Sequence, residues 1–239
     1  MFKYEMHCHT QETSKCSRIA GADLIDFYHS LGYTGVVITD HFFNGNTTVP
    51  AELPWAERVE LFAEGYRAAK RRGDEIGVDV FFGWEFAEKG SHFLTYGLGV
   101  DWLCANEDCD KLSTNEYCDR VHASGGFIVQ AHPFRTPGKR DMIRLLPHKV
   151  DAVEIVNASR MSFENQMAAL YAAQYSLCRF CGSDTHSNVI PRLAAIGMEM
   201  RAASAADILA AVIRGECAPI LLARGEAGVW YEVNEFTEE

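Results

Sequence analysis

The sequence predicts an α/β fold in which strands and helices alternate along one domain spanning residues 1–239. Three observations support this prediction. Short apolar runs typical of buried strands alternate with segments of helical periodicity. A length of 239 residues suits a single α/β barrel or a doubly wound sheet. The chain also carries neither an internal repeat nor a linker-like segment rich in Pro, Gly or Ser that would mark a domain boundary.

The elements of the first half follow from apolar spacing. In order, we expect a strand at 2–9, a helix at 22–31, a strand at 35–39, a helix at 54–72, and strands at 78–86 and 92–98. The strand at 35–39 is a continuous apolar run, which is typical of a strand covered on both faces. Pro54 suits the first turn of the long amphipathic helix.

The second half continues the alternation. We expect helices at 114–124, 141–146, 162–175 and 205–214, and strands at 127–131, 150–156, 177–182, 194–200 and near 219–222. The first of these helices ends at Gly125-Gly126, a C-terminal stop signal. The succession of β-α units is compatible with a barrel or with a doubly wound sheet.

Composition narrows the function classes. The formal net charge is −11, which argues against a general nucleic-acid binder, so we expect no stable nucleic-acid partner. No apolar run approaches the roughly 18 residues of a membrane span, and no basic stretch precedes an apolar run at the N-terminus. We therefore expect a cytoplasmic protein whose eight cysteines are mostly reduced. The oligomeric state cannot be inferred from the sequence.

Potential metal ligands fall at the C-terminal ends of the predicted strands. His7 and His9 lie two residues apart on the first strand, so their side chains project from the same face. The other strand ends carry Asp40 and His41, Glu85, His132, and Asp184 and His186. Each residue alone has an ordinary structural interpretation. In combination they predict one site, because such strand ends converge on one face of a barrel or line the crevice of an open sheet.

The donor set indicates the kind of metal. Imidazoles with carboxylates, and no thiolate cluster, suit Zn, Mn or Fe. More than four donors imply more than one ion, and paired ions can share a bridging hydroxide that attacks a phosphoryl group. Glu85 is the candidate bridging ligand because a carboxylate offers two oxygens.

The ordered motifs resemble those of a known family. They are His7-Cys8-His9, Thr39-Asp40-His41, Gly83-Trp84-Glu85, Ala131-His132-Pro133 and Gly182-Ser183-Asp184-Thr185-His186. This order is similar to that of the PHP family, named for bacterial polymerase subunits and histidinol phosphatase. The resemblance implies a distorted seven-stranded (β/α) barrel. It also implies a site for two or three divalent ions and hydrolysis of phosphate esters.

The resemblance also implies how the ligands are shared. One ion would be held by His7, His9, Glu85 and Asp184, a second by Glu85, His92 and His132, and a third by His41 and His186. Many members complete the third site with an Asp or His five or six residues after the second histidine. This chain has Ser14 and Lys15 there, and Glu12 or Cys16 could substitute. We expect Glu12, because a carboxylate suits hard or borderline ions.

Phosphate recognition calls for cationic partners, ideally the planar fork of an arginine. Arg135 follows His132 by three residues, and Arg160 follows the strand at 150–156, so both should lie on the face that carries the site. Arg135, Arg160 and Asp184 are the candidate catalytic residues. Arg192 is a weaker candidate for binding phosphate.

Three functions remain open at this stage. The first is a metal-dependent phosphoric ester hydrolase acting on a small phosphorylated metabolite or a short oligonucleotide, with an acidic lid at 101–115. Histidinol phosphate is one candidate substrate, but these motifs are shared across the family and cannot select it. The second is C–N bond hydrolysis in the style of the amidohydrolases, which also begin with His-x-His. The third is a non-catalytic metal-binding module.

Overall fold

The strands form two sheets. The computed structural model describes residues 1–135 and 142–233. The six-stranded sheet has the order β11-β10-β9-β1-β2-β3, with β1 (Phe2–Cys8), β2 (Gly35–Ile38), β3 (Asp79–Phe82), β9 (Arg192–Met198), β10 (Cys217–Arg224) and β11 (Trp230–Val233). The five-stranded sheet has the order β4-β5-β6-β7-β8, with β4 (Trp84–Glu88), β5 (Ser91–Tyr96), β6 (Phe127–Ala131), β7 (Ala152–Asn157) and β8 (Cys178–Gly182). Both sheets mix parallel and antiparallel pairs.

The expectation of a seven-stranded barrel is corrected by this arrangement. Among the described residues, no continuous ladder closes the strands into a barrel. The two sheets instead meet at isolated bridges, between Cys8 and Thr185 and between His41 and Glu85. Both bridges involve residues of the predicted metal motifs or their immediate neighbours. The α/β class is therefore confirmed, and the predicted site lies at the junction of the sheets.

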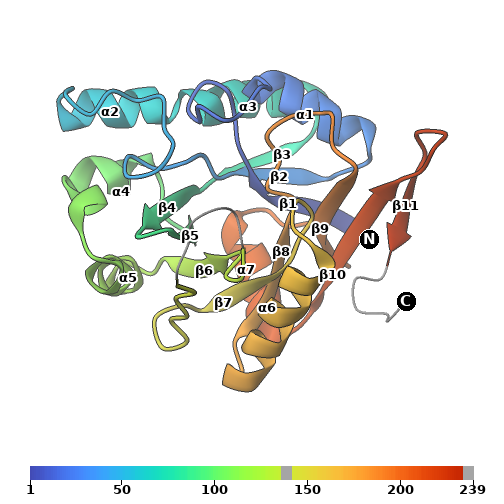
Figure 1. The fold of residues 1–239 in the computed structure, drawn as a ribbon. Coiled ribbons are helices and arrows are strands. Elements are labelled where there is room, and N and C mark those ends of the chain that lie inside the picture. Colours follow the sequence, from blue (N-terminus) through green and yellow to red (C-terminus); the bar gives the residue numbers. More distant parts are fainter. Residues whose placement is uncertain (136–141, 234–239) are drawn as a thin grey trace.

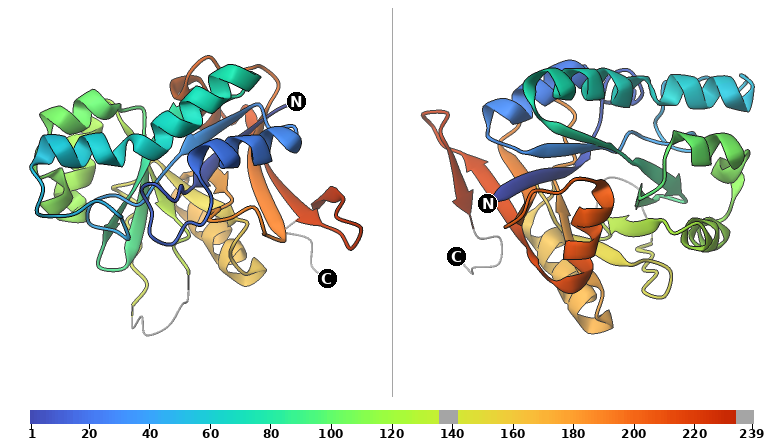
Figure 2. Two further views of the ribbon diagram at one scale, coloured as in Figure 1. Left: turned by 90° about the horizontal axis from the view of Figure 1, so that it is seen from above. Right: turned by 180° about the vertical axis from the view of Figure 1, so that it is seen from behind.

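The helices cover the outer faces of the sheets (Figure 1). They are α1 (Gly21–Ser30), α2 (Trp55–Phe62), α3 (Glu64–Ile76), α4 (Val100–Ala105), α5 (Thr114–Ala123), α6 (Ser162–Tyr175) and α7 (Ala205–Arg214), with a short 3-10 helix at Cys109–Lys111. The first and third pack on each other above β2 and β3, while α5 contacts β6. Helix α6 packs on β7, and α7 comes to the front in the rear view of Figure 2.

Two predicted elements are interrupted. The strand expected at 78–86 is divided at Gly83 into β3 and β4, which belong to different sheets. A Cβ at Gly83 would lie 2.9 Å from the carbonyl oxygen of Thr95, so only glycine allows this close approach. The helix expected at 54–72 is divided at Ala63, whose ψ of −3° interrupts the regular helix.

Two further predictions fail in the region between β5 and β7. Residue 141, where a short helix was expected to begin, lies outside the described residues, and 142–146 are not helical. The stretch at 101–115 is no lid, because it contains α4 and the 3-10 helix, with Leu103 and Cys109 buried in a core cluster. The indole N–H of Trp55 donates to the carbonyl oxygen of Leu103 (2.7 Å), which ties this stretch to α2. The prediction fails because Leu103 and Cys109 provide apolar anchors within an otherwise acidic segment.

Buried apolar side chains fill the interior on both sides of the junction. One cluster joins β1 to β5–β9, α6 and α7, a second lies beneath α2, α4 and α5, and a third packs α1 and α3 on the six-stranded sheet. These clusters fix the strand ends from which the predicted metal ligands project. In the part of the chain that the structure describes, no helix is long and apolar enough to cross a membrane.

Candidate metal centre

Glu85 lies at the middle of the site, and imidazoles surround its two oxygens. Its Oε1 lies 2.8 Å from His92 Nδ1, 3.3 Å from His132 Nε2 and 3.5 Å from His7 Nε2. Its Oε2 lies 2.5 Å from His41 Nδ1. The side chain is fully buried at the start of β4, immediately after the break at Gly83. The carboxylate therefore offers one oxygen to each side of the site, as a bridging ligand requires.

Asp184 supplies the second carboxylate of the site. Its Oδ1 lies 3.3 Å from His9 Nε2 and 3.5 Å from His7 Nε2. His7, His132 and Asp184, with Glu85, form the part of the site that we call the inner donors. Their side chains are at most 7% exposed. His7, His132 and Asp184 lie at or just after the C-terminal ends of β1, β6 and β8, whereas Glu85 lies near the N-terminal end of β4.

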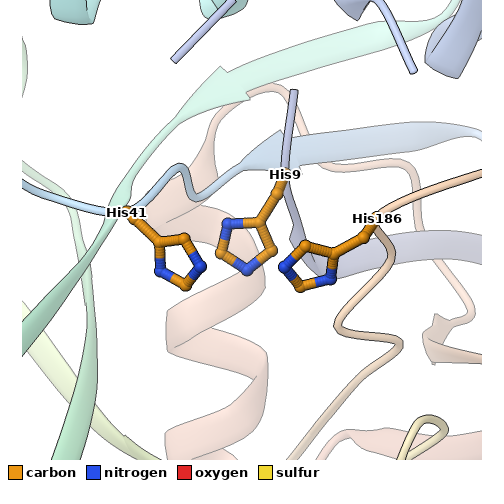
Figure 3. A group of neighbouring side chains, drawn as sticks. All are labelled: His9, His41 and His186. Carbon is orange, nitrogen blue, oxygen red and sulfur yellow. The ribbon is translucent and has the colours of Figure 1, made fainter. Parts of the chain in front are cut away.

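Three imidazoles form a second group, which Figure 3 shows side by side. The ring of His9 lies between those of His41 and His186, with centroid distances of 4.2 and 4.3 Å. One ring nitrogen from each lies within 4.8 Å of the other two. Cys16 lies next to this group, with its Sγ 3.1 Å from His41 Nε2. We call His41, His186 and Cys16 the outer donors, and His9 stands between the two groups.

Glu154, inside the apolar strand β7, holds two of the inner donors. Its Oε1 lies 2.8 Å from His7 Nδ1, and its Oε2 accepts from the backbone N–H of His132 (2.9 Å). The side-chain amide of Asn157 donates to the same Oε2 (2.9 Å). A carboxylate at Nδ1 fixes the ring orientation and tautomer of His7, which leaves Nε2 free to bind a metal. Sequence reasoning missed Glu154, although a charged residue within a continuous apolar strand is the signal that could have identified it.

Ser14 orients the ring of His9, as Glu154 orients the ring of His7. Its Oγ lies 3.4 Å from His9 Nδ1, accepts from the backbone N–H of His41 (3.0 Å) and donates to Asp40 Oδ1 (2.7 Å). Asp40 also accepts from the backbone N–H and the hydroxyl of Thr10. Asp40 is thus directed into the loop after β1 rather than toward an ion. The serine at the position where the family pattern differs holds His9 in place.

Glu5 is a third buried carboxylate, and it ties β1 to the segment after β8. It accepts from the backbone N–H of His7 and from the backbone N–H of Ser183, next to Asp184. Burial raises the pKa of Glu5 to about 7, although these hydrogen bonds and one from Tyr28 act in the opposite direction. Its role is to align the chain segments that carry His7 and Asp184. Sequence reasoning missed it as well.

The backbone at two predicted ligands is strained. His132 has φ of 27° and Asp184 has φ of 55°, in a region that residues other than glycine seldom adopt. Such strain is concentrated at functional sites, where the surrounding structure enforces it. Gly182 allows part of this packing, because a Cβ there would collide with the Cβ of His7 and approach Glu154.

The pKa shifts of the donors run in two directions. Burial opposes protonation of His7 and His41, yet the carboxylates beside them raise the pKa of each imidazole above its usual value. Burial opposes ionisation of Asp184 and Glu85, yet the surrounding imidazoles hold the pKa of each carboxyl well below its usual value. Burial, together with the neighbouring His41 and His186, keeps the pKa of His9 well below normal. The carboxylates are therefore charged and His9 is neutral, which are the states that bind metal ions.

Burial also opposes ionisation of the Cys16 thiol. Hydrogen bonds with His186 and His41 outweigh this effect and lower the pKa of Cys16 to about 6. Cys16 thus adds a sulfur donor to the imidazoles of the outer group.

Unpartnered atoms show that the residues fit a metal. Within the described residues, His7 Nε2, His9 Nε2 and Glu85 Oε2 are buried but form no hydrogen bond. Buried polar atoms without partners are costly, so several at one point indicate a missing ligand. Imidazole nitrogens and carboxylate oxygens are donors that Zn, Mn and Fe accept. The inner donors, with His9 and His92, are therefore suited to hold divalent ions.

A pocket of about 400 Å³ opens beside these donors. Its lining includes Glu85, His41 and Asp184, together with Arg135 and Arg160. In the described part of the chain, the Nε of each arginine is buried without a hydrogen-bond partner. Guanidinium groups in the same pocket as the metal ligands suit a bound anion.

Arg192 does not reach the pocket. It donates to the carbonyl oxygens of Ala158 (3.1 Å) and Arg160 and so supports the loop that carries Arg160.

Of the predicted ligands, only Glu12 is directed away from the site. Both of its carboxylate oxygens accept from the backbone N–H of Gly21, at 3.0 and 3.1 Å, where α1 begins. The helix needs this acceptor, because the residue preceding it, Ala20, has no side-chain oxygen. Cys16, the alternative considered for the same role, lines the pocket instead. The expectation for Glu12 is therefore corrected: its carboxylate caps a helix.

Comparisons with known proteins show the fold. A two-domain protein from Bacteroides vulgatus, described as containing a predicted PHP-like metal-dependent phosphoesterase, matches with a TM-score of 0.68 and 14% identity over 91% of this chain. A putative metal-dependent phosphoesterase from Bifidobacterium adolescentis matches with a TM-score of 0.52 and 17% identity, covering 77% of this chain and 88% of that one. The lesion-specific endonuclease PfuEndoQ from Pyrococcus furiosus matches with a TM-score of 0.59 and 13% identity, covering 91% of this chain and 57% of that one.

These likenesses have defined limits. The chain spans 64% of the length of the Bacteroides protein. No protein-family model matches the sequence, and no curated protein matches it. At such low identities the structures show a shared fold, that of PHP-like metal-dependent phosphoesterases. The resemblance stated from the motifs is confirmed at that level.

Proposed function

We propose that the protein is a metal-dependent phosphoesterase that hydrolyses a small phosphorylated molecule. One observation carries this proposal: buried imidazoles and carboxylates line the same small pocket as two arginines. A cluster of metal ligands alone would suit many reactions. Two guanidinium groups in the same pocket add the recognition that a phosphate dianion requires.

The residues of this chain would divide the work as follows. Divalent ions at the site would supply Lewis-acid activation of water and of the phosphoryl group. His7, Glu85 and Asp184 would hold one ion, which leaves the single lone pair of His9 Nε2 to the outer group. Glu85, with His92 and His132, would hold a second, so that Glu85 belongs to both sets.

Arg135 and Arg160 would bind and orient the phosphate oxygens and balance the charge that develops on them. Glu154 would keep His7 oriented while substrate binds and product leaves. The loop that carries Arg160 is held by Arg192, so its guanidinium is positioned before the phosphate arrives.

Pocket size and net charge support a small substrate. A volume of about 400 Å³ lies near the lower end of the range for small-molecule sites. A net charge of −11 would repel a long polyanion except where bound cations and arginines reverse the local sign. A phosphorylated metabolite or a short oligonucleotide fits both observations.

The test is phosphate release from a panel of phosphomonoesters and short phosphodiesters, using protein stripped of metal and reloaded with Mn²⁺, Zn²⁺ or Fe²⁺. We expect hydrolysis that requires an added ion. Arg160→Ala should raise KM for the best substrate about 10- to 100-fold, because a charged hydrogen bond to phosphate contributes about 1.5–3 kcal/mol.

Arg201→Ala is the matched control, because Arg201 is exposed and pairs with Asp79 away from the site. Its kinetics should not change. Fully loaded protein that releases phosphate from no member of the panel but hydrolyses amides or lactones would overturn the proposal.

A further inference from the structure

Cys16 occupies a position for which the proposed reaction has no use. It is the exposed cysteine that lines the pocket, and its Sγ lies 3.1 Å from His41 Nε2. It also hydrogen-bonds to His186. The thiol therefore contacts two of the three imidazoles that Figure 3 shows.

The third imidazole supplies an independent observation. His9 is fully buried, and within the described residues its Nε2 makes no hydrogen bond. Figure 3 shows this ring between those of His41 and His186, which approach it from either side. Ser14 holds the opposite nitrogen, Nδ1, so the free Nε2 is the atom directed into the group. This nitrogen lies 3.3 Å from Asp184 Oδ1, and it is buried without a hydrogen bond at the point where two other imidazoles and a thiol meet. Such an atom indicates a cation site.

We propose that Cys16 is a thiolate ligand of a divalent ion held by His9, His41 and His186. The residue assigned to this role by sequence, Glu12, is bound to the start of α1. The loop that carries Cys16 is held in place by neighbouring contacts: the backbone N–H of Lys15 donates to Asn46 (2.9 Å), and Thr47 and Thr48 bond to Thr13. These hydrogen bonds hold the loop in a conformation that directs the sulfur to the imidazoles. On binding, the thiol proton passes to solvent.

A thiolate changes which ion this position selects. Three imidazoles with one sulfur form a closed tetrahedral donor set of the kind that zinc accepts, whereas carboxylate and water ligands favour Mg and Mn. The outer position should therefore prefer Zn²⁺ or Co²⁺ over Mn²⁺, unlike the carboxylate-rich inner donors. This inference rests on the proposed metal centre but not on the reaction it performs.

Cobalt provides a direct test, because a thiolate bound to Co²⁺ gives a sulfur-to-metal charge-transfer band in the near ultraviolet. Metal-free protein is titrated with Co²⁺ while absorbance and bound metal are measured. We expect the band to develop in the wild type, and Cys16→Ser to lose both the band and one bound ion per chain. Cys104→Ser is the control, because Cys104 is an exposed cysteine on α4 that does not line the pocket.

Alkylation gives a second readout that does not depend on colour. Iodoacetamide should label Cys16 in the metal-free protein, and Zn²⁺ should protect it, while Cys104 is labelled in both states. Cys16→Asp should restore the lost ion with a preference shifted toward Mn²⁺.

The inference is overturned if Co²⁺ binds to the wild type without the band, or if Cys16→Ser keeps the same stoichiometry and spectrum. Either result, together with metal-dependent phosphate release, would exclude Cys16 as a metal ligand and leave the proposed function intact. Failure of all ions to bind would overturn both.

Discussion

The two halves of the site are built differently. The inner donors project from strand ends, and His7 and Glu85 are completely buried. The outer donors lie on connecting loops, where the His186 side chain is 30% exposed and Cys16 is open to solvent. Glu154 holds the inner histidines with a charged oxygen, whereas Ser14 supports His9 with a hydroxyl at 3.4 Å.

This difference indicates different tasks. Donors fixed by core packing and buried carboxylates are preorganised, so an ion there would be retained through repeated turnover. Donors on loops depend on how well those loops are held, and their ion would exchange more readily. The inner half is therefore expected to carry the chemistry, and the outer half to adjust the charge and the choice of metal.

Glu85→Gln should have the largest effect, because this residue contacts both halves. The substitution removes a buried negative charge that lies near five imidazoles. We expect phosphate release to fall at least about 1000-fold, since Lewis-acid stabilisation of several kcal/mol depends on the ions this residue holds. Metal analysis should show ions lost from both groups. A variant with full metal content and near-normal turnover would mean that Glu85 bridges nothing.

Glu154→Gln should weaken the inner half alone. The amide can still contact His7 and His132 but carries no charge to fix the imidazole orientation. We expect metal affinity or activity to fall about 10- to 100-fold, as for other carboxylates behind metal-bound histidines. The cobalt-thiolate band should remain. If this band disappears while the inner ions are retained, the two halves are not independent.

Ser14→Ala should have a smaller effect, confined to the outer half. It removes the hydroxyl behind His9 and one of the partners of Asp40. Because the lost contact with His9 is long and neutral, we expect at most about a 10-fold loss of affinity for the outer ion. Equilibrium Co²⁺ titration measures this loss. An equal loss at the inner donors would show that His9 serves both groups to the same extent.

Glu12→Ala should leave both halves intact. Its carboxylate caps α1, so the expected change is a loss of about 0.5–2 kcal/mol of folding free energy, seen as a lower Tm. Metal content and kcat should match the wild type. A lost ion with unchanged Tm would return Glu12 to the role that the sequence suggested.

The fold was predictable where local pattern decides it. The apolar run at 35–39 and the helix near residue 22 both correspond to observed elements, β2 and α1. The division at Gly83 was not predictable, because it depends on a close approach to Thr95, whose position is set by long-range pairing. The same long-range pairing decides that the strands form two sheets rather than a closed barrel.

The residues of the site likewise divide into those that the sequence predicted and those that it did not. The sequence predicted that His7, Glu85 and Asp184 lie in one site, because the strand ends of this class of fold converge. The supporting residues could not, since Glu154 acts from the middle of a strand and Ser14 through a loop. Only the path of that loop decides which of Glu12 and Cys16 lies beside the imidazoles. The preference of divalent ions for carboxylates favoured Glu12. Its carboxylate instead accepts from the backbone N–H of Gly21 at the start of α1.

The most direct measurement is an anomalous difference map from a crystal of the full chain grown with Mn²⁺, Zn²⁺ and inorganic phosphate. We predict two ions at the inner donors on either side of Glu85, a zinc ion among His9, His41, His186 and Cys16, and a phosphate between the ions and the two arginines. A map with no ion at the junction of the sheets, or with phosphate bound away from Arg135 and Arg160, would contradict the account.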